Sequence, residues 1–197
     1  GLLSLGSNNL TLGASASISG TPSSSAMVVA TGSGELRKIF GNIGSFSFPI
    51  GDNTGTAEYS PVSVNMTTGT FSAGAYVSAR VVNAKHPNNS NTNNYLNRYW
   101  ILNQSGAVGY SANISATYTT DDIVGNDANI LMGRWSGGAI WQRFASSINT
   151  STRTISTSAL TNLGQFTGIS AISPSVSVSA TNNNICNGAS TTISANA

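Results

Sequence analysis

Residues 45–52, with the sequence SFSFPIGD, alternate apolar and polar side chains with a period of two. In an extended chain this spacing places Phe46, Phe48 and Ile50 on one face and Ser45 and Ser47 on the other. That is the pattern of a strand with one buried face. The same pattern recurs along most of the 197 residues, interrupted by Gly, Asn and Pro, and it predicts an all-β fold.

The composition explains how such a chain stays in solution with few charges. Hydrophobic residues make up 39% of the sequence, which is enough for a core, but charged residues make up only 7%. Soluble domains usually carry about 25%. Ser, Thr, Asn and Gly replace the missing charges, and these residues favour turns and strand surfaces over helices. The balance favours an extracellular all-β protein.

The charge and the lengths of the apolar runs predict that the chain binds no nucleic acid and does not insert into a membrane. The net charge is +2, and the basic residues are scattered except for Arg37-Lys38, so no cationic face for nucleic acid is expected. No run of about 20 apolar residues is present, so no membrane insertion is predicted. The chain has neither a signal peptide nor an initiator Met, and we interpret it as a piece of a longer polypeptide or a processed product.

Residues 31–172 are predicted to form one antiparallel β-sandwich of the Ig-like or jelly-roll type, because short strands recur about every ten residues. A hairpin around 136–138 is expected to pack Trp135 against Trp141. The predicted strands lie near 36–40, 45–50, 60–66, 74–82, 97–103, 111–118, 128–134, 139–145, 152–157 and 165–170.

The two ends of the chain follow different patterns. Residues 1–30 contain Leu-x-Leu pairs in very short strands, which suit either solenoid-like β coils or a hairpin turning at Asn8-Asn9. Such coils cannot bury their apolar face alone, so we expect them to continue in a neighbouring domain or in preceding sequence. Residues 173–197 are predicted to be the first strands of another Ig-like domain, which is incomplete here.

Several of these segments together resemble one family. The run GLLSLGSNNLTL at residues 1–12 is similar to the solenoid-like coils of the large surface proteins of Bacteroidetes. The block Phe46-x-Phe48-Pro49-Ile50-Gly51-Asp52, with Tyr59-Ser60-Pro61-Val62 and Arg98-Tyr99-Trp100, resembles the β-sandwich module that follows such coils. The segment 185–191, ICNGAST, resembles the opening of their Ig-like repeats.

The resemblance implies a secreted, surface-displayed, adhesin-like or stalk protein exported by the type IX pathway, at the outer surface of a Gram-negative cell. The sorting domain of that family is absent from these residues. Cys186 is the only cysteine. An odd cysteine in a secreted chain suggests a partner elsewhere, and a buried free thiol is the alternative. The resemblance implies a disulfide partner later in the same repeat, outside this segment.

Catalytic groups are scarce. His86 is the only histidine, so neither a His-based dyad nor a multi-histidine metal site can form within one chain. It lies beside Pro87 in the Asn-rich segment 83–94, where a solvated structural role is expected. A glycosidase needs two facing carboxylates, whereas the adjacent Asp121 and Asp122 would point to opposite faces of a strand. The sequence therefore predicts no enzyme.

Two weak ligand sites are predicted. Asp121, Asp122 and Asp127 concentrate oxygen ligands suited to Ca²⁺, although their spacing is not that of an EF-hand and a polar turn explains them equally well; Asp52-Asn53 with Glu58 is a weaker candidate. Tyr95, Tyr99 and His86, in and beside the long loop, form a candidate sugar-binding site, although strand aromatics more often belong to the core.

The favoured function is a non-catalytic structural or adhesive module of an extracellular fibre or adhesin. Its expected partners are neighbouring domains or further copies of the same protein, paired through edge strands. A carbohydrate-binding module that recognises glycans and an accessory domain of a secreted hydrolase are the alternatives.

Overall fold

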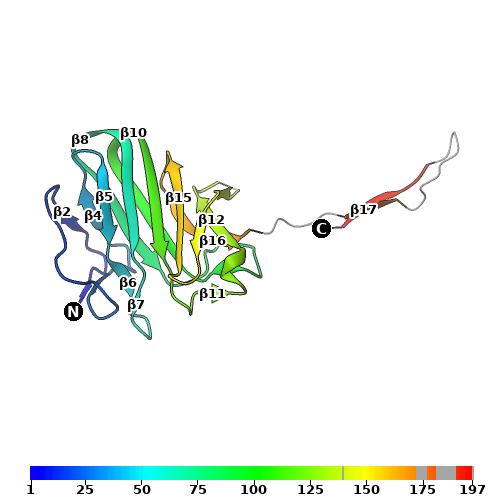
Figure 1. The fold of residues 1–197 in the computed structure, drawn as a ribbon, viewed down its shortest axis with the longest axis horizontal. Helices are drawn as coiled ribbons and strands as arrows, with labels where there is room; N and C mark the ends of the chain where they lie inside the picture. The colour runs from blue at the N-terminus through cyan, green and yellow to red at the C-terminus, as the bar shows by residue number, and fades with distance from the viewer. Residues whose placement is uncertain (139, 172–176, 181–189, 197) are drawn as a thin grey trace.

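The computed structural model describes residues 1–138, 140–171, 177–180 and 190–196, and these residues fold as an all-β, sandwich-like structure (Figure 1). Within that part of the chain, no helix is long and apolar enough to cross a membrane. The first strands are β1 (Leu2–Ser4), β2 (Leu10–Leu12), β3 (Met27–Val29), β4 (Leu36–Ile39), β5 (Gly44–Phe48), β6 (Ile50–Asp52), β7 (Glu58–Tyr59) and β8 (Val62–Val82).

The second half of the chain continues with shorter strands around one long one. They are β9 (Tyr95–Leu96), β10 (Tyr99–Thr117), β11 (Ile123–Val124), β12 (Ile130–Trp135), β13 (Gln142–Arg143), β14 (Ser147–Asn149), β15 (Thr154–Leu160) and β16 (Gln165–Ser170). A 3-10 turn at Asp127–Asn129 precedes β12. A hairpin of β17 (Ser177–Ala180) and β18 (Ile193–Asn196) follows, and Cys186 lies outside the described residues.

The antiparallel pair β8 and β10 forms the centre of the fold (Figure 1). The prediction of separate strands at 60–66 and 74–82, and at 97–103 and 111–118, is wrong, because each pair is one continuous strand. The glycines of β8 and β10 lie inside continuous strands, at irregularities in their register, and not in turns. Gly69 and Gly106 adopt positive φ angles of 131° and 77°, and the register shifts beside Gly106.

The two long strands belong to both halves of the sandwich. At one end β8 pairs with β5 and β10 pairs with β15, whereas at the other end β8 pairs with β4 and β10 pairs with β16. The alternating side chains of these strands then fill one core. Fully buried members of that core include Leu36, Phe48, Met66, Trp100, Leu102, Ile114 and Phe166.

The alternation in β5 has the predicted sense. Phe48 is buried and Phe46 half-buried, and the two rings pack edge to face with centroids 4.9 Å apart, while Ser45 and Ser47 are exposed. The predicted strand nevertheless ends before Pro49. Ile50 begins β6, which belongs to a different sheet, so the predicted strand 45–50 is two strands.

The N-terminal strands stack in parallel. β1 pairs with β3 and β3 with β6, all parallel, while β2 pairs in parallel with β4. β1 and β2 do not pair with each other, so the alternative of a hairpin turning at Asn8-Asn9 is wrong. The outer edges of β1 and β2 pair with no other described strand, and Leu2 and Leu3 at this edge are 43% and 51% exposed.

The hairpin predicted around 136–138 is confirmed in β12 and β13, where Gly133 lies opposite Arg143. The rings of Trp135 and Trp141 are 5.4 Å apart. The predicted strand 139–145 is shorter than expected: of its described residues only Gln142–Arg143 are in a strand, and the chain bends before it enters β14.

We predict that Gly34→Ala forces apart two backbone segments that lie against each other, the segment between β1 and β2 and the segment between β3 and β4. A Cβ on Gly34 would lie 2.3 Å from the carbonyl oxygen of Asn8, so the stacked backbones must move apart. The expected cost is about 1–3 kcal/mol of unfolding free energy, with faster hydrogen exchange in β1 and β2. Gly41→Ala is the matched control, because a Cβ there meets nothing within 4 Å. Equal melting temperatures for the two variants would contradict this packing.

Candidate functional site

Three carboxylates from separate parts of the chain converge on the buried guanidinium of Arg98, which lies between β9 and β10. Its Nη1 donates to Asp52 Oδ2 at 2.7 Å, its Nε donates to Asp122 Oδ2 at 2.8 Å, and its Nη2 donates to Glu58. Asp52 ends β6, Glu58 begins β7, and Asp122 lies in the turn after β10. One side chain therefore joins the four-stranded sheet, which contains both β6 and β7, to the turn that follows β10.

Neutral donors engage the remaining carboxylate oxygens of this cluster. Asn83 Nδ2 donates to Asp52 Oδ1 at 3.1 Å and to Glu58 Oε2 at 3.2 Å, and Thr119 Oγ1 donates to Glu58 Oε1 at 2.8 Å. Burial by itself would lower the pKa of the guanidinium, but hydrogen bonds to Asp122 and Asp52 and their charges raise it above its ordinary value. The arrangement is an ion-pair network, with every carboxylate oxygen already occupied.

The three residues predicted to hold calcium have separate surroundings. Asp121 is exposed, Asp122 binds Arg98, and Asp127 accepts a hydrogen bond of 2.8 Å from the hydroxyl of Tyr118. The structure therefore does not bring them together. Within the described ranges, no group of three or more His, Cys, Asp and Glu residues is placed to hold a metal ion.

His86 is buried, with 1% of its surface exposed, so the expected solvated role is wrong. Its ring packs edge to face against Tyr99 and Trp141, each with a centroid distance of 4.8 Å. Asn88 N–H donates to Nδ1 at 3.2 Å, which leaves the proton on Nε2 to donate to Gln165 Oε1 at 2.8 Å. The long loop is thus anchored to the sheet.

The two tyrosines of the predicted sugar site are also engaged with their own neighbours. Tyr99 contacts the ring of His86, while the ammonium group of Lys85 lies 4.4 Å from the ring centroid of Tyr95. Burial lowers the pKa of His86, and the hydrogen bond to Gln165 opposes that shift. His86 and Tyr99 belong to a packed aromatic cluster with Trp135 and Trp141, whereas Tyr95 contacts Lys85 instead.

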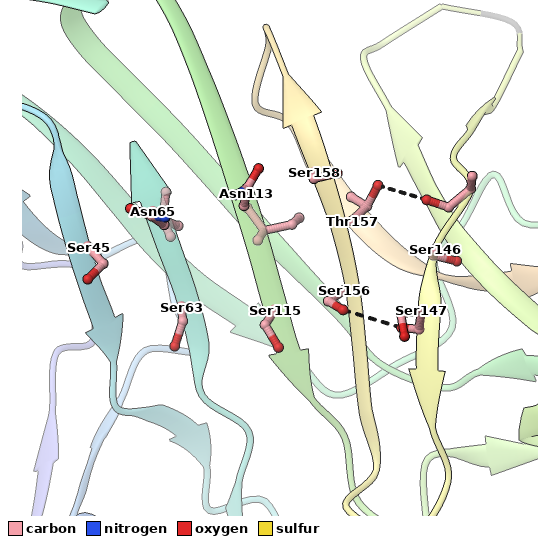
Figure 2. A pocket seen from close by; sticks show the side chains of 13 residues that line it. Ser45, Ser63, Asn65, Asn113, Ser115, Ser146, Ser147, Ser156, Thr157 and Ser158 are labelled. Atoms are coloured by element: carbon pink, nitrogen blue, oxygen red, sulfur yellow. Dashed lines mark hydrogen bonds between the residues drawn. The ribbon is translucent and has the colours of Figure 1, made fainter. Parts of the chain in front are cut away.

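An open groove that the sequence pattern does not predict lies on the outer face of the ten-stranded sheet, which contains β8 and β10 (Figure 2). Strand register creates it. Ser47 lies opposite Ser63, Ser63 opposite Ser115, Ser115 opposite Ser156, and Ser156 opposite Ser147. A row of serines therefore crosses five adjacent strands, which are spaced about 4.8 Å apart in β-sheets. We call the site the serine groove.

The serine groove has a volume of about 630 Å³, and none of its lining side chains is ionisable. A second row, Ser45, Asn65 and Asn113, runs beside the first. The lining residues are Ser45, Ser63, Val64, Asn65, Asn113, Ile114, Ser115, Ala145, Ser146, Ser147, Ser156, Thr157 and Ser158.

A bulge in β15 shapes the groove at Asn113. The register places Ala112 opposite Leu160 but Ile114 opposite Thr157, so β15 has one residue more than β10 there. Asn113 Oδ1 accepts a hydrogen bond of 3.1 Å from the backbone N–H of Ala159, whose φ is 57°. The amide of Asn113 is therefore held in a defined orientation beside Ser158.

Comparison with known proteins finds no match: no protein-family model, no curated protein and no solved structure matches the chain. The resemblance to Bacteroidetes surface proteins therefore stays a prediction. The features of the molecule that bear on function are the ion-pair network, the unpaired edge of β1 and β2, and the serine groove.

We predict that Arg98→Met lowers the unfolding free energy by about 3–5 kcal/mol, because it leaves three buried carboxylates without their cation. Urea denaturation measures this change. Arg37→Met is the matched control: its ion pair with Glu35 is partly exposed, so about 1 kcal/mol or less is expected. A similar loss in both variants would show that the Arg98 network has no special weight.

Acid should destabilise the protein partly through His86. Its pKa is lowered on folding, so below the ordinary value of 6.5 the unfolded chain binds a proton that the native chain does not. The contribution of His86 to the unfolding free energy is therefore fully present above that value. As the pH decreases below it, this contribution is lost by up to about 1.4 kcal/mol per pH unit, until the native imidazole also binds a proton.

Comparing the wild type with His86→Gln at about pH 7.5 and about pH 5.5 isolates this contribution from the carboxylates. The difference in unfolding free energy between the two proteins should shrink at the lower pH. A difference that is independent of pH would contradict the buried, neutral state of His86.

Proposed function

We propose that this chain is a non-catalytic structural and adhesive module of an extracellular protein, in which neighbouring β domains or further copies add to its open sheet edge. The observation that carries the proposal is the parallel stack of β1, β3 and β6 beside β2 and β4. Parallel coils of this kind bury their apolar face only when another layer covers it.

The exposed end of the stack has the features of an edge that accepts another strand. Leu2 and Leu3 are exposed at β1, and an apolar groove of about 370 Å³ lies beside them, lined in part by Leu10, Leu12 and Ile18. An unpaired strand edge with apolar side chains is a template for pairing with a second chain. The edge therefore supports a connecting function.

The ionisable groups support a non-catalytic function. Asp52, Glu58 and Asp122 converge in the described structure, but they surround Arg98 with all their oxygens hydrogen-bonded. General acid–base catalysis needs a carboxyl group free to exchange a proton with a substrate. The serine groove, by contrast, has only hydroxyl, amide and aliphatic side chains.

An extracellular location, at a cell surface or on a fibre, is part of the same proposal. Only 7% of the residues are charged, and Ser, Thr and Asn take their place on the exposed strand faces. An almost uncharged exterior lets β modules pack closely without electrostatic repulsion. Export by the type IX pathway and a disulfide partner for Cys186 are further expectations of the proposal.

Self-association tests the proposed edge. The purified chain should associate with increasing concentration in sedimentation velocity experiments, and electron microscopy should show regular assemblies. Leu3→Lys should weaken that association at least tenfold, because a charge on β1 must be desolvated when another strand pairs beside it.

Val108→Lys is the matched control, since Val108 is also apolar and 66% exposed but lies in β10, away from this edge. It should leave the association unchanged. A monomer at all concentrations, with no regular assemblies in the microscope, would rule out the function as a self-assembling module.

A further inference from the structure

We infer that the serine groove binds a neutral polysaccharide, with the cross-strand rows of hydroxyl and amide groups hydrogen-bonding successive sugar units. The groove lies across β5, β8, β10, β15 and β14 (Figure 2), and its volume of about 630 Å³ falls within the range of about 300–1,000 Å³ typical of ligand sites. It shares no residue with the aromatic cluster around His86.

Free hydrogen-bonding groups are the first argument for this ligand. No other described residue makes a hydrogen bond with the hydroxyl of Ser45, Ser63 or Ser115. These groups come from three neighbouring strands and project from the same face of the sheet (Figure 2). Each can donate one hydrogen bond and accept two, which matches the donor and acceptor character of sugar hydroxyls.

Two further groups in the groove are held in place by the fold. Asn113 Oδ1 is occupied by the N–H of Ala159, so its amide N–H₂ is the part left for a ligand. Ser146 Oγ accepts a hydrogen bond of 2.9 Å from the N–H of Met132, which leaves its own proton to donate. Preorganised donors of this kind reduce the entropy cost of binding.

The chemistry of the lining also decides the ligand class. The groove contains neither the Arg and Lys side chains that recognise phosphate, sulfate or carboxylate nor the carboxylates that recognise cations. It contains no aromatic ring on which a nucleobase or an apolar ligand could stack. A polymer rich in uncharged hydroxyl groups remains as the ligand whose groups the lining can satisfy.

The absence of aromatic rings from the groove predicts weak binding per sugar. Each hydrogen bond replaces one made to water, so a monosaccharide should bind poorly. Affinity should rise with the number of sugar units that occupy the rows together, and with repeated copies of the module on one polymer. The natural probe is therefore a long polysaccharide.

Affinity gel electrophoresis of the purified chain tests the inference. The gels contain one of four neutral polymers (xylan, mixed-linkage β-glucan, mannan or dextran) or one of two anionic polymers (alginate or heparin). We expect retardation by at least one neutral polymer and none by the anionic ones. Ser63→Ala combined with Ser115→Ala should weaken that retardation at least tenfold, and Ser115→Trp should abolish it by filling the groove.

Thr70→Ala is the matched control, because Thr70 is exposed on β8 outside the groove, and it should bind like the wild type. Circular dichroism and melting curves confirm that each variant is folded, and Ser63→Ala alone provides a milder change. The inference is overturned if no neutral polymer retards the chain, if the serine variants bind like the wild type, or if only anionic polymers bind. Because the serine variants leave β1 and β2 intact, a negative result here would not affect the proposed self-association.

Discussion

The buried guanidinium of Arg98 binds carboxylates from three separate parts of the chain. Asp52 and Glu58 belong to the four-stranded sheet, Arg98 precedes the long strand β10, and Asp122 precedes β11 in a separate two-stranded sheet. A buried charge is tolerated only when its partners are in place, so the network favours the arrangement in which all three carboxylates reach the guanidinium. Its contribution is geometric definition as much as stability.

The ion-pair network also takes up half of the side-chain carboxylates of the chain and so leaves few negative charges for the surface. The chain has six carboxylates, and the fold uses three of them around Arg98, while Glu35 pairs with Arg37 and Asp127 accepts the hydroxyl of Tyr118. What remains on the exposed strand faces is mostly Ser, Thr and Asn. Neither of the two open features of the surface depends on charge: the serine groove presents hydroxyl and amide groups, and the edge of β1 and β2 presents unpaired backbone and leucine side chains.

Local pattern was a reliable guide where one residue's environment depends on its near neighbours. The alternation at Ser45–Phe48 predicts which side chains are buried, and the Trp135 hairpin is where the sequence places it. Glycine was a poor guide to strand ends, because Gly69 and Gly106 adopt positive φ angles inside long strands, where the sequence pattern predicts turns. The burial of His86 has a related cause: Tyr99 of β10 and Trp141 of a distant hairpin pack against this one residue of an otherwise largely exposed loop.

The sequence by itself determined the all-β class, the scarcity of surface charge and which alternate side chains of a strand face the core. These properties depend only on composition and on a hydrophobic period of two. Only the tertiary structure decided that Asp52, Glu58 and Asp122 share one guanidinium, and that five serines from five strands align in one row. Both facts require the register between strands that are distant in sequence. Register is set by core packing across the whole sheet, because a slip of one residue would expose every buried side chain of a strand.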